Sequence, residues 1–288
     1  MKTTYTTHLS RILPALALLA LSALPASAQS GSTTWSGNTS TDFYDGSNWT
    51  NGQYPNGNTT FVDSALTGAA NTTVDRASGG TYIFGLYFNN TLGTENTYTI
   101  NGPQGFTIGG SVIKTAEVTS GSLTDVINAD IADTGTANVW DIGANHHLDM
   151  NGVYSGGNTT TKTGAGTLTF AGVNTYTGAT TITAGTLEIG GAGSLGSGSY
   201  AGTIANSGTF EYNSSANQTL SGVISGTGSV VKGNTGTLTL TGANTYSGVT
   251  TINAGILEIQ SDDALGSTVG ETIINGGAKL TISGGITT

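Results

Sequence analysis

Residues 166–190 read GTLTFAGVNTYTGATTITAGTLEIG, and residues 236–260 read GTLTLTGANTYSGVTTINAGILEIQ. The similarity continues at one constant offset, so that 152–197 matches 222–267 without an insertion. Such registered self-similarity is typical of repeat proteins, in which each unit stacks on its neighbours. We therefore expect function to lie on an extended surface rather than first in a pocket.

Apolar residues in these stretches alternate with polar ones, which is the period of a β-strand with one buried face. Leu187 and Ile189, for example, flank Glu188, and clusters of Gly, Asn and Ser separate one such burst from the next. We expect helix to be nearly absent. The predicted inward positions are Leu168, Phe170, Ile182, Leu187, Ile189, Leu238, Leu240, Ile252, Leu257 and Ile259.

The spacing of the bursts predicts the coil length of a solenoid. Three coils of about 23 residues fill one 70-residue unit, which is too long for a hairpin array and suits a parallel β-helix. Residues 61–150 carry weaker bursts and are interpreted as diverged coils of the same solenoid. Residues 29–60 contain Trp35, Trp49 and Tyr54, and we expect them to form an aromatic cap over the first coil.

Residues 1–28 are predicted to be a secretory signal. Lys2 and Arg11 precede an apolar run from Ile12 to Leu24, and the small residues at 26–28 resemble a cleavage site. Removing this segment leaves five basic and 17 acidic residues, a net charge of −12, which disfavours nucleic acid as a partner. The chain has no cysteine, so its stability must come from burial and hydrogen bonds rather than disulfides.

The repeated motif resembles a known family. Residues 164–198, and in the second copy Gly236–Leu240, Asn244–Tyr246 and Ala264–Gly266, are similar to the autotransporter-associated β-strand repeat, also called the passenger-associated transport repeat. We assign the two repeats to residues 158–198 and 228–268 within a regular β-helix over 151–288. The resemblance covers about a quarter of the chain.

This resemblance implies a secreted, right-handed β-helix passenger that is normally followed by an outer-membrane translocator barrel. Such a barrel needs many alternating strands of about ten residues. The sequence ends at Thr288, part-way through a coil. We therefore expect a C-terminally incomplete passenger, a fragment of a longer gene, and an open last coil that promotes end-to-end self-association.

Several motifs suggest chemistry, but we predict no catalytic, cofactor-binding or metal-binding residue. GAGSLG at 191–196 matches a dinucleotide fingerprint but follows no βαβ pattern, so we interpret it as a turn. His146 and His147, near Asp141 and Asp149, should point to opposite faces of one strand. The repeated pairs are predicted to be solvated outward residues, with the carboxylates about 14 Å apart: Glu188 with Glu258, and Lys162 with Lys232.

The predicted function is therefore a non-enzymatic, surface-displayed or secreted passenger segment, either a stalk or an adhesin that contacts an extracellular glycan or a host or matrix surface. Two alternatives remain open. A polysaccharide lyase or hydrolase would need acids on adjacent coils of one groove. An ice-binding solenoid would need outward pairs such as Thr167 with Thr169, and Thr237 with Thr239, on every coil.

Overall fold

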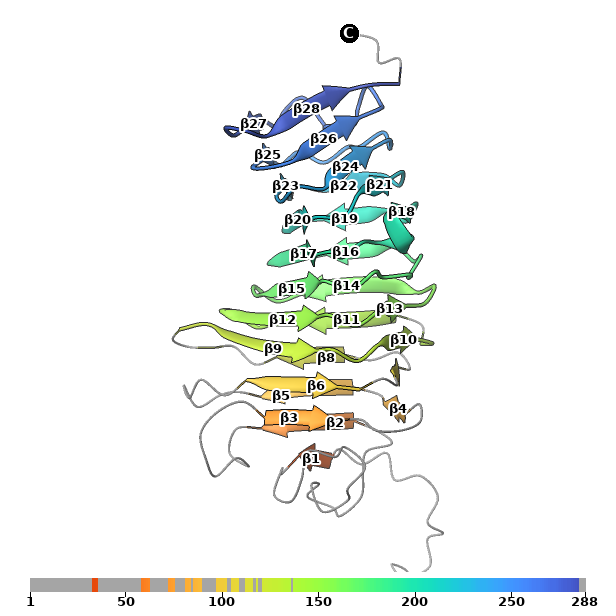
Figure 1. Cartoon of the computed structure of the whole chain (residues 1–288), viewed down its shortest axis with the longest axis vertical. Helices are drawn as coiled ribbons and strands as arrows, with labels where there is room; N and C mark the ends of the chain where they lie inside the picture. The colour runs from red at the N-terminus through yellow and green to blue at the C-terminus, as the bar shows by residue number, and fades with distance from the viewer. Residues whose placement is uncertain are drawn as a thin grey trace, which may run out of the picture. The chain divides into compact units, whose positions relative to one another are not determined.

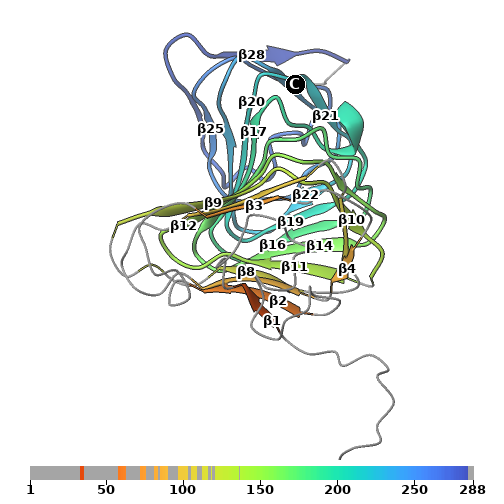
Figure 2. The same cartoon turned by 60° about the horizontal axis from the view of Figure 1, so that its bottom comes forward.

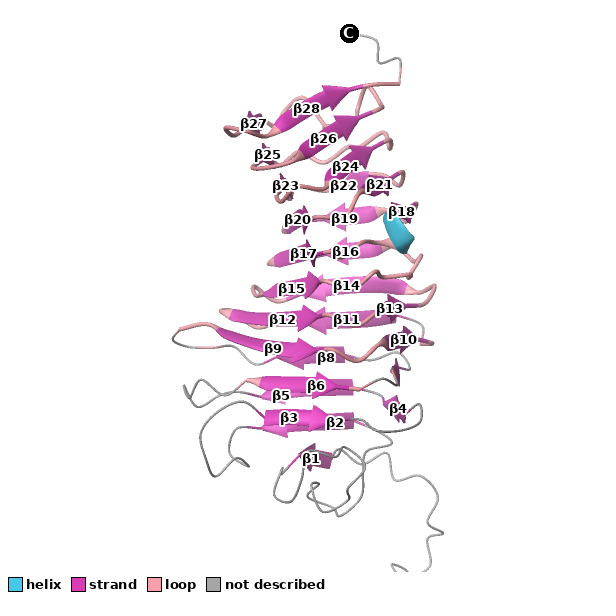
Figure 3. Ribbon diagram, viewed as in Figure 1, coloured by secondary structure: helices cyan, strands magenta, loops and turns pink. Residues whose placement is uncertain are grey.

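The computed structural model describes residues 33–35, 58–62, 72–75, 81–83, 85–89, 97–102, 105–108, 112–115, 118, 121–135 and 137–284. In this part of the chain nearly all regular structure is β-strand, and the one helix is a single 3₁₀ turn, η3 (Gly196–Gly198) (Figure 3). The described residues include no helix of sufficient length and apolarity to cross a membrane. All-β structure is confirmed.

The strands form a parallel solenoid, in which successive turns of the chain add strands to three sides (Figure 1). A nine-stranded sheet forms one side. In spatial order it contains β1 (Thr33–Trp35), β2 (Asn58–Val62), β5 (Gly85–Asn89), β8 (Val112–Thr115), β11 (Ala137–Asp141), β14 (Thr159–Thr163), β16 (Thr180–Ile182), β19 (Ile204–Asn206) and β22 (Ile224–Ser225).

A ten-stranded sheet forms the second side. Its order is β27 (Thr272–Ile274), β25 (Thr250–Ile252), β23 (Ser229–Lys232), β20 (Thr209–Ser214), β17 (Thr186–Gly191), β15 (Thr167–Phe170), β12 (His146–Met150), β9 (Leu123–Ile127), β6 (Tyr98–Asn101) and β3 (Thr72–Asp75). Every pairing within it is parallel and joins strands of successive coils.

The third side consists of two shorter parallel sheets (Figure 2). The four-stranded sheet contains β13 (Tyr154–Ser155), β10 (Ile131–Asp133), β7 (Phe106–Ile108) and β4 (Thr81–Ile83). The five-stranded sheet contains β18 (Ser199–Tyr200), β21 (Gln218–Leu220), β24 (Thr237–Leu240), β26 (Ile256–Ile259) and β28 (Lys279–Ile282).

The core lies inside the coils and follows the period-two pattern of the strands. All ten predicted inward positions are buried, while Thr169, Glu188, Thr239 and Glu258 between them are partly exposed. Aromatic side chains of successive coils also pack on one another inside the stack, for example Tyr154 on Phe170 with ring centroids 5.5 Å apart. The core is thus one continuous column, as expected when each coil buries its face only against its neighbours.

The predicted coil length was too long. Leu168 pairs with Leu187, Leu187 with Phe210, and Phe210 with Val230, so three coils take the chain only from residue 168 to residue 230. Leu238, the repeat partner of Leu168, lies further along the chain, in β24 of the next side. One repeat unit is therefore three coils plus one side, and the second repeat is rotated by one side relative to the first.

The corners between sides use left-handed glycines at equivalent repeat positions. Gly185 has φ 65° and Gly255 has φ 67°. A Cβ there would lie 2.3 Å from the carbonyl oxygen of Gly166 or Asn234 in the preceding coil. Only glycine fits both the backbone angle and this close approach.

Two predicted N-terminal segments fall mainly outside the described residues. The signal peptide over residues 1–28 lies outside them, as do Trp49 and Tyr54 of the predicted cap. Trp35 belongs to β1, whose backbone pairs in parallel with β2 and places Trp35 opposite Phe61. This segment continues the solenoid by one strand, and the cap stays a prediction.

Candidate functional site

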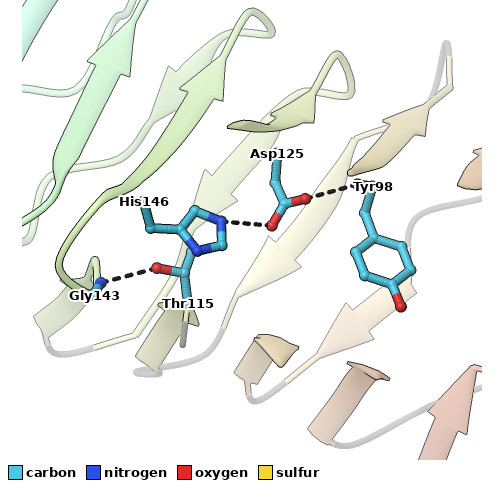
Figure 4. A network of polar contacts seen from close by, with 5 residues as sticks. All are labelled: Tyr98, Thr115, Asp125, Gly143 and His146. Carbon is cyan, nitrogen blue, oxygen red and sulfur yellow. Dashed lines mark hydrogen bonds and ion pairs between the residues drawn. The ribbon is translucent and has the colours of Figure 1, made fainter. Parts of the chain in front are cut away.

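The histidine pair is split by the strand, as predicted. His146 is fully buried and His147 is exposed, because successive residues of β12 point to opposite faces. The imidazole Nε2 of His146 lies 2.8 Å from Asp125 Oδ2 on the adjacent strand β9, and both side chains are 0% exposed. Figure 4 shows this contact, together with the backbone N–H of Tyr98, which donates to Asp125 Oδ1 over 2.7 Å.

The buried pair has no access to a substrate. Thr115, which is also buried, accepts a hydrogen bond from the backbone N–H of Gly143 over 2.9 Å (Figure 4). Because the hydroxyl, the imidazole and the carboxylate are all enclosed by the core, no external reactant reaches them. The cluster therefore joins three consecutive coils of the diverged segment.

The two acids expected near the histidines lie on different sheets. Asp149 lies outward on the ten-stranded sheet, while Asp141 lies on the nine-stranded sheet and accepts a hydrogen bond from Thr163 Oγ1 over 3.0 Å. Asp125 was not predicted as the partner of His146, since it is 21 residues away and lies on another coil. Among the described residues, no group of three or more histidine and acidic side chains is arranged to hold a metal.

The prediction that Lys162 and Lys232 are solvated was wrong, because both side chains are 0% exposed. Lys162 Nζ donates to the carbonyl oxygens of Thr163 (2.7 Å), Gly164 (2.8 Å) and Ala184 (3.2 Å). These three acceptors match the three N–H groups of an ammonium ion. Burial lowers the pKa of Lys162 to about 8.

Lys232 has the same arrangement in the second repeat. Its Nζ donates to the carbonyl oxygens of Gly233, of Asn234 (2.8 Å) and of Ala254 (3.2 Å). Burial lowers the pKa of Lys232 to about 8 as well. Each lysine therefore joins the corner of its own coil to the corner of the next one.

The structure brings together two carboxylates that the sequence did not pair. Glu188 of β17 and Glu211 of β20 lie directly opposite each other on adjacent coils, both on the outward face of the ten-stranded sheet. Asn213 Nδ2 donates to Glu188 Oε1 over 2.9 Å and holds that side chain in place. Partial burial, and then the negative charge of Glu188, raise the pKa of Glu211.

The predicted partner of Glu188 is not on the same sheet. Glu258 lies on β26 of the five-stranded sheet and pairs with Thr239 and Thr281. The predicted separation of the two carboxylates assumed that one repeat unit is three whole coils. It is wrong because the second repeat is rotated by one side relative to the first. For the same reason Thr167 and Thr169 lie on β15 whereas Thr237 and Thr239 lie on β24, so these pairs do not stack into one array.

The NTY segment of each repeat forms a corner that joins three coils. Asn244 Oδ1 accepts from the backbone N–H of Ile224 in the coil before, and Asn244 Nδ2 donates to Ala264 O in the coil after, over 2.8 and 2.6 Å. Tyr246 Oη lies 2.7 Å from Thr250 Oγ1 inside the core. These residues were noticed only as a family motif, but their role is to satisfy buried backbone and hydroxyl groups.

The dinucleotide-like motif is a corner, as predicted. Gly191 ends β17 and has φ 59°, and Gly196 begins the 3₁₀ turn before β18. A phosphate-binding motif of this kind would need a longer helix opening directly after the strand. The motif therefore closes a coil.

Comparison with known proteins agrees with this arrangement. The family model described as Passenger-associated-transport-repeat matches residues 161–189 and 230–259. The Adhesin BmaC autotransporter of Brucella suis biovar 1 (strain 1330) is 42% identical over 69 residues, which cover 22% of this chain and 2% of that protein. No solved structure matches. The chain thus carries two stretches that match the passenger-associated transport repeat.

Proposed function

We propose that this chain is a non-enzymatic β-helix passenger segment, exported through its N-terminal signal and displayed at the cell surface or released outside the cell. The observation that supports this most is the presence of two passenger-associated transport repeats within an unbroken stack of parallel strands. Similarity to a protein named as an adhesin and an autotransporter supports the same function. Export would then depend on an outer-membrane translocator as a partner.

The outward surface suits a stalk or an adhesin. Residues 159–247 contain four charged side chains, of which the two lysines are buried and Glu188 and Glu211 lie outward. The rest of this outward surface consists largely of short hydroxyl and amide side chains, which bind polar surfaces such as an extracellular glycan or a host or matrix protein through hydrogen bonds. The net charge of the whole chain, −10, disfavours nucleic acid as a partner.

Display and binding can be tested separately. Cells producing the full-length gene product with an epitope tag in the exposed corner at Asn217 should be labelled by antibody without permeabilisation. The purified chain should bind at least one member of a panel of immobilised glycans and matrix proteins. Labelling only after permeabilisation would contradict display, and a chain that is displayed but binds nothing on the panel would contradict the adhesin role while leaving a stalk.

A polysaccharide-acting enzyme is the second candidate, favoured by Glu188 and Glu211. Neighbouring strands lie about 4.8 Å apart, which is close to the ~5 to 5.5 Å carboxyl separation of retaining glycosidases. The raised pKa of Glu211 suits a general acid. Depolymerisation of a polysaccharide that is lost in both Glu188→Gln and Glu211→Gln would favour this function, whereas we expect no turnover by the native chain.

A further inference from the structure

Three asparagine–glycine pairs lie in the described part of the chain, and the fold holds them very differently. They are Asn101–Gly102, Asn151–Gly152 and Asn275–Gly276. The backbone nitrogen of a glycine is able to attack the side-chain carbonyl carbon of the asparagine before it, because glycine has no side chain to obstruct the approach. The attack also requires that this nitrogen is free and that the backbone is able to turn.

The pair at Asn151 is packed against the preceding coil. Gly152 is buried, and its N–H donates to Ile127 O over 3.3 Å. A Cβ on Gly152 would lie 2.2 Å from Ala129 O, so the two backbones are in close contact. The side chain is fixed as well, since Asn151 Nδ2 donates to Asn128 Oδ1 over 2.8 Å. The glycine nitrogen is therefore occupied, and its backbone has no room to turn.

The pair at Asn101 is held by its sheet. Asn101 is the last residue of β6, which lies between β3 and β9, and its backbone pairs with Asp75. Its Oδ1 accepts a hydrogen bond from Asn128 Nδ2 over 2.6 Å. A turn of this residue would therefore break contacts with the coil before and with the coil after.

The pair at Asn275 lies in an open corner between β27 and β28. The N–H of Ala278 donates to Asn275 O over 3.1 Å, which closes a four-residue turn with two glycines at its centre. Gly276 and Gly277 are both exposed, and no heavy atom lies within 4 Å of a Cβ built on either one. Within the part of the chain that the structure describes, the N–H of Gly276 has no hydrogen-bond partner.

The side chains of Asn275 and Asn151 make equivalent contacts, so the two pairs differ in their glycines. Asn275 Nδ2 donates to Asn253 Oδ1 over 2.6 Å, just as Asn151 Nδ2 donates to Asn128 Oδ1. We propose that Asn275 is a site of spontaneous modification to aspartate and isoaspartate, with water as the other reactant. This inference does not depend on the proposed function.

The reaction balances without any further reactant. The nitrogen of Gly276 forms a bond to Asn275 Cγ and loses its proton, while Nδ2 gains a proton and leaves as ammonia, which closes a five-membered succinimide ring. Water then adds to one of the two ring carbonyl carbons. Breaking the bond from nitrogen to Cγ gives aspartate, and breaking the bond from nitrogen to the backbone carbonyl carbon gives isoaspartate.

The modification acts on the coil that contains β27 and β28. A carboxylate at position 275 replaces the donor to Asn253 Oδ1 by an acceptor, and adds a negative charge to an acidic chain. Isoaspartate also inserts one carbon into the backbone between two strands that each pair in register with the preceding coil. Both products should therefore increase local opening of this coil.

Mass spectrometry of the purified full chain, stored in mildly alkaline buffer, tests the proposal. The folded chain should convert Asn275 at least about tenfold faster than Asn151, because only one of the two glycine nitrogens is free. The same chain unfolded in urea should convert the two sites within about threefold of each other, because both are asparagines followed by glycine. The comparison separates the effect of the fold from that of the dipeptide.

Two variants isolate the reacting group. Gly276→Ala fits the open corner but places a methyl group beside the attacking nitrogen, so it should slow conversion of Asn275 at least about tenfold. Val269→Ala, at an exposed position of the same coil, is the matched control and should change the rate less than about twofold. Asn275→Asp reproduces one product, and hydrogen exchange at β27 and β28 should be at least about threefold faster in it than in the native chain.

The proposal is overturned if Asn151 is converted as fast as Asn275 in the folded chain. It is also overturned if the folded chain stays unmodified for as long as the unfolded chain needs to react completely, or if Gly276→Ala reacts at the native rate. Unchanged hydrogen exchange in Asn275→Asp would refute the effect on the coil.

Discussion

The first repeat, 161–189, and the second, 230–259, share several equivalent contacts but occupy different sides of the solenoid. In the first, Lys162 binds the carbonyl of Ala184, and Asn174 Oδ1 accepts from the N–H of Tyr154. In the second, the corresponding contacts join Lys232 to Ala254 and Asn244 to Ile224. Every one of these pairs is shifted by the length of one repeat unit, although the strands that carry them belong to different sheets.

The difference shows that the repeat specifies contacts with the coils before and after it, and not a position on one face. Its strands supply an inward apolar row and a buried lysine, and its corners supply an asparagine and a tyrosine that satisfy buried polar groups. Any side of the column offers the same parallel neighbours, because each coil pairs only with adjacent coils. A repeat that is not a whole number of coils long is therefore tolerated.

The largest loss of stability is expected when a charged side chain is introduced into the buried core. Leu187 and Leu257 occupy equivalent positions and are both 0% exposed. Leu187→Asp and Leu257→Asp should each lower the free energy of unfolding by about 4 kcal/mol, because each buries an unpaired carboxylate. Urea unfolding measures this, with Glu188→Gln and Glu258→Gln as near-neutral controls. Equal losses in the leucine and glutamate variants would refute the register.

The buried lysines test whether the two repeats are equivalent despite their rotation. Lys162→Met and Lys232→Met keep the side-chain length but remove the ammonium donor from buried corner carbonyls, which should cost about 3 kcal/mol each. Because the contacts are the same in both repeats, the two losses should agree within about 0.5 kcal/mol. A loss confined to one repeat would show that the side of the solenoid matters.

Removing a buried tyrosine hydroxyl should lower stability by different amounts in the two repeats. Thr180 Oγ1 lies 3.0 Å from Tyr176 Oη and also 2.8 Å from Tyr200 Oη, whereas for Thr250 Oγ1 the structure shows one partner, Tyr246 Oη. Tyr246→Phe should therefore cost about 1.5 kcal/mol and Tyr176→Phe about 0.5 kcal/mol, since only the first leaves a buried hydroxyl unpaired. Thermal melting of both variants measures the difference, and the reverse order would contradict this account.

The lysines also predict a pH dependence. Their pKa is 10.5 when unfolded and about 8 when folded, so between these values the unfolded chain binds more protons. The free energy of unfolding should rise with pH from about 8 to about 10, and this gain is lost again as the pH falls toward 8. Above pH 10 stability should decline, because burial raises the pKa of Tyr154 to about 12. The double variant Lys162→Met with Lys232→Met should show a flatter rise, and an unchanged slope would contradict the assignment.

The smallest change in stability is expected from the residues that neighbour Glu188 and Glu258 on the outward faces of their sheets. Glu211 stands beside Glu188 in the first repeat, whereas Thr281 stands beside Glu258 in the second. The raised pKa of Glu211 means that its contribution to stability is present below pH 4.5 and lost as the pH rises. Glu211→Gln should therefore stabilise the chain at pH 7 by about 0.5 kcal/mol after solvent screening, and not at pH 3.

The reverse change provides the control for this pair. Thr281→Glu introduces a second carboxylate beside Glu258 and should destabilise the chain slightly at pH 7. Because Ser283 and Gln260 donate hydrogen bonds that lower the pKa of Glu258, this carboxylate stays ionised and repels the new one. A stabilising effect of Thr281→Glu would exclude repulsion as the cause of the difference.

Much of the fold could be predicted from local pattern. Alternation such as that around Glu188 placed ten inward residues correctly, and the split of His146 from His147 followed from the geometry of one strand. The buried lysines could not be predicted in this way. Lys162 lies in the polar stretch TTTKT, and one of its acceptors, Ala184 O, belongs to the next coil.

The sequence by itself determined that this chain forms a parallel solenoid with an apolar interior, because period-two alternation and the long repeat are local and can be counted. Only the tertiary structure decided which residues share a side. Coil length depends on how each corner closes, and differences of a few residues per coil add up to a rotation of one whole side between the repeats. Thus Glu188 neighbours Glu211 rather than stacking below Glu258.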